Sequence, residues 1–339
     1  MIDMDKHRRA LDYCTYCPKL CTFACPASDV ERREAVTPWA KMTLANLLVK
    51  GQVTLAADTA EPLYHCLACR LCTTYCKHGN EVGEALADAR AWAVERGLPH
   101  PALAALSENY RRFGNAPGIE AGKRLRLILP DRCFAPDAEA IYFPAAETIA
   151  KRPQEIAAVF SVFDKLGLDT VACHDGPSSC VGMPLYWAGF RRLFRDHAAR
   201  VADDLARYRL IVSSSPETVY ALKALYEETG VDFRRRVRHL VEFIEPHLAG
   251  ITPASKAEER VALHEPAYLV RYLGLGHSVR QLVERFTEEP LTPFVWREDG
   301  AYPAGTSGAL PLILPEAARK IAAERLRQAR EARAELVVA

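Results

Sequence analysis

The chain lacks a charge excess, a long apolar run and an export signal. Its 44 basic and 43 acidic residues leave a formal net charge of +1, which gives no reason to expect binding to nucleic acid or to an acidic membrane surface. The longest apolar stretches, such as Leu310–Leu314, are far shorter than the roughly 20 residues of a bilayer-spanning helix. The first residues carry charges with no apolar core behind them, so we expect no signal peptide and a cytoplasmic protein.

Nucleotide-binding fingerprints are missing as well. No G-x-G-x-x-G segment follows a predicted strand, so the sequence gives no sign of a bound flavin or nicotinamide. The composition is otherwise that of an ordinary globular protein, with 49% hydrophobic and 26% charged residues. A length of 339 residues allows two or three domains, each with its own core.

Cysteine is what the chain has in excess. Eight of its 11 cysteines fall into two short motifs, C-x2-C-x3-C-x3-C-P and C-x2-C-x2-C-x3-C. The first motif comprises Cys14, Cys17, Cys21 and Cys25, and the second comprises Cys66, Cys69, Cys72 and Cys76. In a chain without an export signal, such cysteines are expected to bind metal rather than to form disulfides.

The second motif has the spacing of a [4Fe–4S] loop, in which three thiolates of one tight turn bind three irons and a remote fourth thiolate completes the cube. The first motif keeps the trailing Pro26 but has one extra residue between Cys17 and Cys21, which a loop can absorb. Zinc is the alternative, but its four-cysteine sites are built from two separated C-x2-C knuckles. His65, next to Cys66, is expected to be a neighbour of the cluster or a surface residue rather than a ligand.

In two-cluster proteins the fourth cysteine of each run binds the other cluster. We therefore expect two [4Fe–4S] clusters that relay single electrons. The predicted ligand sets are Cys14, Cys17, Cys21 and Cys76 for one cluster, and Cys66, Cys69, Cys72 and Cys25 for the other.

Residues 1–100 are predicted to form a helical domain around the cysteine loops. Thr37 and Pro38 supply an N-cap and a first-turn proline for a helix that Gly51 ends, and a second helix is expected from Asn80 to Arg96. Residues 101–137 are rich in proline, glycine and arginine, and we expect a linker there with one small helix near Ala102–Tyr110.

From residue 138 onward, predicted strands alternate with predicted helices, which favours a parallel sheet covered by helices. The expected strands are Ala140–Phe143, Asp169–Ala172, Leu210–Ser213, Arg260–His264, Pro293–Trp296 and Glu335–Val338. The arginine-rich segment Phe233–His239 is expected to be a solvated helix face that could dock an acidic partner. Because the alternation recurs, we expect a duplication with repeats at 138–250 and 251–339. The predicted fold class is a helical domain followed by a duplicated α/β domain.

Both halves resemble parts of one family. The helical part resembles the two-cluster ferredoxin domains of succinate dehydrogenase, anaerobic glycerol-3-phosphate dehydrogenase and heterodisulfide reductase. The second half resembles the cysteine-rich (CCG) domain of heterodisulfide reductase, on the strength of Ser179–Phe190 and His264–Ala267. The family has a paired Cys-Cys-Gly at the first place and His-Asp-Pro-Cys at the second. The resemblance implies a duplicated parallel-sheet module.

The chain departs from this family in its thiols. Active members gather cysteines at three places in each repeat and hold non-cubane clusters that cleave disulfides. Here Phe143–Ala146 and Ser214–Thr218 carry no cysteine, the turn between them keeps only Cys180, and the second repeat has Ala267 and Glu298–Gly300 at its first two places. Its last cysteine turn would begin where the sequence stops. Serine, valine and alanine cannot replace thiolates, so we expect a ligand-depleted domain retained for its shape.

Three cysteines lie outside the two motifs. Cys173 and Cys180 could form a redox pair or help to bind a lone metal with His174, but two ordinary buried thiols are the simpler expectation. Cys133 is expected to have no role.

These patterns predict an iron–sulfur electron-transfer subunit of an anaerobic-type redox complex, without catalytic residues of its own. Its partner would be a flavoprotein or another iron–sulfur subunit in a hetero-oligomeric complex. Two alternatives remain. One is a heterodisulfide reductase-like oxidoreductase subunit acting on a thiol or disulfide substrate. The other is a structural or redox-sensing iron–sulfur protein.

Overall fold

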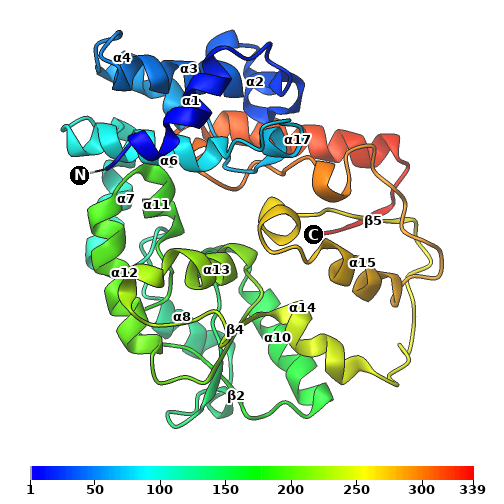
Figure 1. Ribbon diagram of the computed structural model, residues 1–339. Coiled ribbons are helices and arrows are strands. Elements are labelled where there is room, and N and C mark those ends of the chain that lie inside the picture. Colours follow the sequence, from blue (N-terminus) through cyan, green and yellow to red (C-terminus); the bar gives the residue numbers. More distant parts are fainter. Residues whose placement is uncertain (1, 177) are drawn as a thin grey trace. The chain divides into compact units, whose positions relative to one another are not determined.

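The computed structural model describes residues 2–176 and 178–339, whose path is shown in Figure 1. The chain divides into two compact units. The first contains the N-terminal part up to Ala104, the short segment Tyr186–Arg191 and the C-terminal segment Ala254–Ala339. The second contains Ala105–Leu185 and Arg192–Pro253.

The first unit is mainly helical. Its helices are α1 (Arg8–Thr15), α2 (Pro26–Glu31), α3 (Pro38–Val49), α4 (Ala57–Ala60), α5 (Leu71–Thr74), α6 (Val82–Glu95), α15 (Gly276–Glu284), α16 (Leu310–Ile313) and α17 (Pro315–Glu331). The predicted cap of α3 is present, because the Thr37 hydroxyl accepts a hydrogen bond from the amide of Ala40 at 3.2 Å. Leu11, Met42, Leu63 and Leu86 form a core between α1, α3 and α6, and α17 lies alongside α2 (Figure 1).

Two short parallel strands complete the first unit. Strand β5 (Val261–Leu263) pairs with β6 (Leu336–Val338), near the positions that the sequence predicts. The prediction of a strand at Pro293–Trp296 is wrong, because this segment is an irregular loop. Its backbone carbonyls accept from arginine side chains instead of from a neighbouring strand: Arg325 donates to Trp296 at 2.9 Å, and Arg297 donates to Phe294 at 3.2 Å.

The second unit is built on a four-stranded parallel sheet in the order β2-β1-β3-β4. The strands are β1 (Ala140–Tyr142), β2 (Val171–Cys173), β3 (Leu210–Ser213) and β4 (Val237–His239). The prediction of a helix at Phe233–His239 is wrong, because this segment ends in strand β4. Its Val237 and His239 side chains are buried, while Arg238 between them is partly exposed, which is the alternation of an edge strand.

Helices surround this sheet. They are α7 (Ala104–Phe113), α8 (Ala121–Ile128), α9 (Ala146–Lys151), α10 (Pro153–Leu166), α12 (Arg191–Leu205), α13 (Pro216–Tyr220) and α14 (Leu240–Ile244), while α11 (Met183–Ala188) passes from the second unit into the first. The segment 101–137 thus holds two regular helices, α7 and α8, where one small helix was expected. Leu125 of α8 is buried with Tyr142 and Phe160 in the core. The mixture of helices and a parallel sheet confirms the predicted class at this level.

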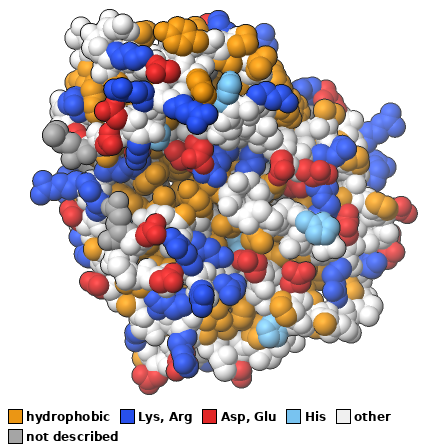
Figure 2. Space-filling model, in the orientation of Figure 1, with side chains coloured by type: hydrophobic (Ala, Val, Ile, Leu, Met, Phe, Trp, Pro, Cys, Tyr) orange, Lys and Arg blue, Asp and Glu red, His pale blue; other side chains and the backbone are white. Residues whose placement is uncertain are grey.

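The surface carries charges of both signs. In the face shown in Figure 2, acidic and basic side chains are interspersed, as the net charge of +1 leads one to expect. Within the described part of the chain, no helix has the length and apolar character that crossing a membrane requires.

Candidate functional site

The eight motif cysteines surround two neighbouring cavities in the first unit. The first cavity, site I, is lined by the thiols of Cys14, Cys17, Cys21 and Cys76. The second cavity, site II, is lined by those of Cys25, Cys66, Cys69 and Cys72. Each motif therefore sends its last cysteine to the cavity of the other, and Cys72 borders both cavities. The structure brings together the members of each predicted set, and their ligation of iron stays a prediction.

Left-handed residues shape the cysteine loops. Lys19 has a φ of 67° between Cys17 and Cys21, and in the second motif Ala68 and Arg70 have φ values of 49° and 55°. Non-glycine residues rarely adopt this conformation. Alternation of left-handed and right-handed residues makes successive N–H groups converge on one side of the chain, which creates a hollow that favours an anion.

Two thiols in each site are costly to ionise without a positive partner. Burial raises the pKa of Cys14 to about 11 and that of Cys21 to about 12 in site I. In site II it raises the pKa of Cys69 to about 11 and that of Cys72 well above its ordinary value. Thiolates are soft ligands that iron–sulfur clusters use, and bound iron would supply the missing positive charge. The donor set therefore fits a cubane cluster at each site.

Lys41 is a residue of site II that the sequence prediction missed. It is only 1% exposed, its ammonium nitrogen lies 3.8 Å from Cys25 Sγ, and it donates to the carbonyl oxygen of His65. Burial would lower the pKa of Lys41, but the thiolates of the four site II cysteines reverse this and raise it. A buried ammonium group needs an anionic partner, and the site II sulfurs, as thiolates, are that partner.

The sequence did contain a signal for Lys41. Helix α3 buries Met42, Ala45 and Leu48, and Lys41 lies on the same face at helical spacing. A lysine among the buried positions of a largely apolar helix indicates a buried anion.

His65 is fully buried and lies beside site II. Its two ring nitrogens lie 2.8 Å from a carboxylate oxygen of Glu31 and 2.5 Å from one of Glu61. Both nitrogens are therefore occupied by carboxylates, so His65 fits the expected role of a neighbour and not that of a ligand.

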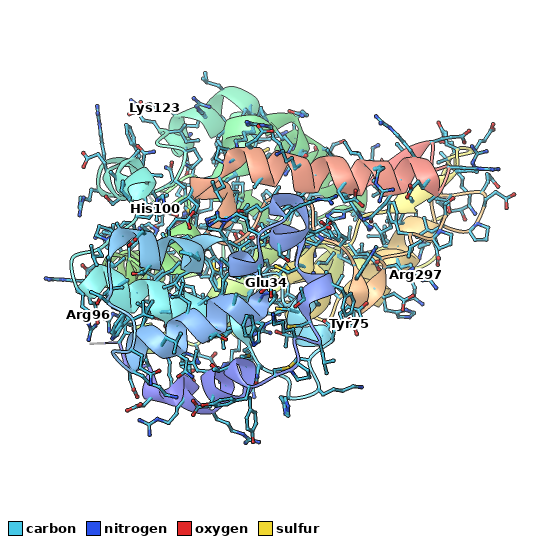
Figure 3. All side chains as sticks on the ribbon, turned by 90° about the horizontal axis from the view of Figure 1, so that it is seen from above. Glu34, Tyr75, Arg96, His100, Lys123 and Arg297 are labelled. Carbon is cyan, nitrogen blue, oxygen red and sulfur yellow. The ribbon has the colours of Figure 1, made fainter. Side chains whose placement is uncertain are left out.

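Site I lies under exposed aromatic and aliphatic side chains. Tyr16 is 83% exposed and Leu20 is 54% exposed, and both line its cavity. Tyr75, labelled in Figure 3, does not line this cavity and packs edge-on against Phe23 with a ring-centroid distance of 4.9 Å. The amide of Asn80 donates to Cys14 Sγ at 3.3 Å. The indole N–H of Trp39, also in this cavity, has no acceptor within the described part of the chain.

The three other cysteines lie in the second unit, where Cys180 is apart from Cys133 and Cys173. Cys180 shares a hydrogen bond of 3.0 Å with the Tyr110 hydroxyl, and burial raises its pKa to about 12. Cys173 is packed with Cys133 in the core beside the sheet. The Nε2 atom of His174 faces the carbonyl oxygen of Ser178 at 3.1 Å. All three thiols are unpaired and buried.

Among the described residues, no three histidine, cysteine or acidic side chains converge as ligands of a single ion do. A cubane does not require such convergence, because each of its thiolates binds a different iron.

Comparison with protein families gives one match. Residues 10–80 match the 4Fe-4S dicluster domain, and the matched stretch contains all eight motif cysteines. The chain is an iron–sulfur protein. The match supports binding of [4Fe–4S] clusters by this region and a role in electron transfer. Searches among curated proteins and among solved structures found no similar chain.

Proposed function

We propose that this iron–sulfur protein is an electron-transfer subunit with two [4Fe–4S] clusters, one in site I and one in site II. The observation that carries the proposal is the exchange of Cys25 and Cys76 between the two motifs. This exchange is the ligand arrangement of two-cluster ferredoxins. Because Cys72 borders both cavities, the two sites are neighbours, as a relay requires.

The residues around the sites suit this task. Each cluster, when bound, accepts and releases one electron. Lys41 in site II and the amide of Asn80 in site I provide a positive charge and a hydrogen-bond donor beside the thiolates. Such groups stabilise the more negative, reduced state and so set the reduction potential.

The second unit, in this proposal, is a degenerate relative of the heterodisulfide reductase sheet domain. Serines stand where the family has cysteines after its last strand, and each makes a structural hydrogen bond. Ser214 pairs with the Tyr142 hydroxyl at 2.8 Å, and Ser215 caps α13. The preceding Ser213, the last residue of β3, donates to the Phe143 carbonyl at 2.8 Å. These serines maintain the shape of the strand ends, and the dispersed thiols of Cys173 and Cys180 provide no paired redox centre.

The partner in this scheme is a flavoprotein or another iron–sulfur subunit in a hetero-oligomeric complex. The proposal assigns no catalytic role to this chain, so its electrons would pass to a site in another protein. All 11 cysteines are unpaired, which suits a reducing compartment such as the cytoplasm.

Anaerobic purification followed by iron analysis and EPR spectroscopy tests the proposal. The expected result is about eight irons per chain and two cubane signals that appear and disappear reversibly with dithionite and an oxidant. Zinc in place of iron, or about four irons per chain, would contradict it. A paramagnetic signal that depends on a disulfide substrate would support the reductase alternative, and clusters that cannot be reduced reversibly would support a structural role.

A further inference from the structure

The C-terminal segment binds four consecutive backbone carbonyls of the site II loop. The amides of Ala309 and Leu310 donate to the carbonyl of Cys66 at 3.1 and 3.2 Å. The hydroxyl of Ser307 donates to Leu67 at 2.8 Å and that of Tyr272 to Ala68 at 2.6 Å. Arg271 Nε donates to the carbonyl of Cys69 at 2.5 Å. We call these five hydrogen bonds to four carbonyls the carbonyl clamp.

The carbonyl clamp fixes the direction of the amide groups as well. In a trans peptide the C=O and the following N–H point in opposite directions. When the carbonyls of residues 66–69 face the C-terminal segment, the N–H groups of residues 67–70 face the other way, toward the thiols. One of these contacts is present, because the amide of Ala68 lies 3.3 Å from Cys66 Sγ. The left-handed conformations of Ala68 and Arg70 strengthen this convergence.

The C-terminal segment packs directly against the backbone of the site II loop. Gly308 has a φ of +72°, and a Cβ atom there would lie 2.4 Å from the carbonyl carbon of Leu67. Glycine is therefore required for the clamp to reach the loop. Ala267, Tyr302 and Leu310 pack around the loop in the same apolar core.

Arg271 is the charged member of the clamp. Its Nη1 atom donates to the carbonyls of Asp299 at 3.0 Å and Ala301 at 2.9 Å, so the guanidinium group is held from two sides. Arg271 therefore holds a positive charge beside Cys69, and its hydrogen bond to the Cys69 carbonyl fixes the orientation of the peptide group between residues 69 and 70.

We propose that Arg271 is a positioning residue for site II, and that Arg271, Tyr272 and Ser307 together raise the reduction potential of the site II cluster by turning the 67–70 amides toward its sulfurs. This inference rests on the proposed function, since it requires a cluster in site II. Amide hydrogen bonds and nearby positive charge stabilise the reduced cluster, which carries one more negative charge. No comparable clamp exists on the described residues of the site I loop, so the effect should be confined to one cluster.

The test measures both midpoint potentials by EPR-monitored redox titration of the full-length anaerobic protein. Arg271→Gln removes the charge and the fork, and should make the site II potential clearly more negative while the site I potential stays unchanged. Arg271→Lys keeps the charge and should give a smaller shift. Tyr272→Phe and Ser307→Ala remove one neutral donor each and should give the smallest shifts in the same direction. Arg319→Gln, which removes an exposed arginine of the same segment paired with Glu316, is the matched control.

The outcomes separate this inference from the proposed function. A wild-type protein without two clusters refutes the proposed function. Two intact clusters with an unchanged site II potential in Arg271→Gln refute the role of Arg271. If Arg271→Gln loses its site II iron, Tyr272→Phe and Ser307→Ala decide, because unchanged site II potentials in both would refute the clamp. Equal shifts at both sites would also refute it.

Discussion

Sites I and II are each lined by a set of four thiols, but the residues around the two sets differ in exposure. Site I is bordered by exposed side chains such as Tyr16 and Leu20. Site II is enclosed by buried residues of the loop, including Leu67, Ala68 and Leu71, and by the C-terminal segment. The two sets of cysteines are chemically equal, so the difference between the sites lies in the residues that the protein packs around them.

The difference also gives the two clusters of the proposal separate tasks. An electron crosses to a partner most easily where a cluster is near the surface, which is site I. Site II has a buried lysine and an arginine beside its thiolates, and we expect it to have the higher reduction potential. In this scheme site I exchanges electrons with the partner and site II holds them.

Substitution of the last cysteine of each motif should have the largest effect on the difference between the two sites. Cys25→Ser, in the first motif, should remove the enclosed site II cluster, and Cys76→Ser, in the second motif, should remove the exposed site I cluster. Each variant should lose about half of its iron and one of the two EPR signals. Cys133→Ser is the control and should keep all of its iron. If each variant instead lost the cluster of its own motif, the predicted ligand sets would be wrong.

Removal of the buried lysine should weaken site II alone. Lys41→Met leaves the thiolate cluster without its buried counter-charge, which we expect to cost the cluster-loaded protein about 3 kcal/mol of unfolding free energy. It should also make the site II potential more negative. Denaturant unfolding and redox titration measure the two effects. Lys50→Met, at the exposed end of the same helix, is the control. It removes an exposed ion pair with Asp12, so it should lower the unfolding free energy far less than Lys41→Met does and leave the site II potential unchanged. A shift of the site I potential by Lys41→Met would refute the assignment.

Glycine substitutions test how tightly the C-terminal segment closes over site II. Gly308→Ala should destabilise the protein by about 2 kcal/mol more than Gly51→Ala, because an added Cβ overpacks against the Leu67 backbone. Gly51 has a φ of +68°, but a Cβ atom added there would meet nothing within 4 Å, so this substitution reproduces the backbone strain without the clash. Thermal unfolding of both variants gives the difference. Equal destabilisation would show that the segment does not close over the loop.

Much of the local structure of the two sites could be predicted from the sequence, because cysteine spacing and helix caps act over a few residues. The motifs defined the grouping of the eight cysteines, and Thr37 and Pro38 marked the start of α3. Lys41 could have been recognised from its position on the buried helix face. The clamp could not, because Arg271 and Ser307 are 202 and 240 residues away from their partners in the loop.

The wrongly predicted strand at Pro293–Trp296 also shows that local sequence patterns do not reveal contacts between distant residues. Its apolar and β-branched residues favour a strand locally. Arg325, from the distant helix α17, donates a hydrogen bond to the carbonyl of Trp296. Its guanidinium group lies 3.7 Å from the ring centroid of Phe294. A tertiary contact that no local pattern contains therefore decides the structure of this segment.

Attack by an external oxidant should be the mildest probe of the comparison. With ferricyanide and an iron chelator added to the wild-type protein, the site I signal should decay several-fold faster than the site II signal, since only site I is bordered by exposed side chains. EPR spectra taken over time separate the two rates. Ser307→Ala removes one hydrogen bond of the carbonyl clamp over site II. The site II signal should then decay faster, while the decay rate of the site I signal stays the same. Equal rates in the wild-type protein would mean that site II is reached as easily as site I, and the division into an exchanging and a storing cluster would fail.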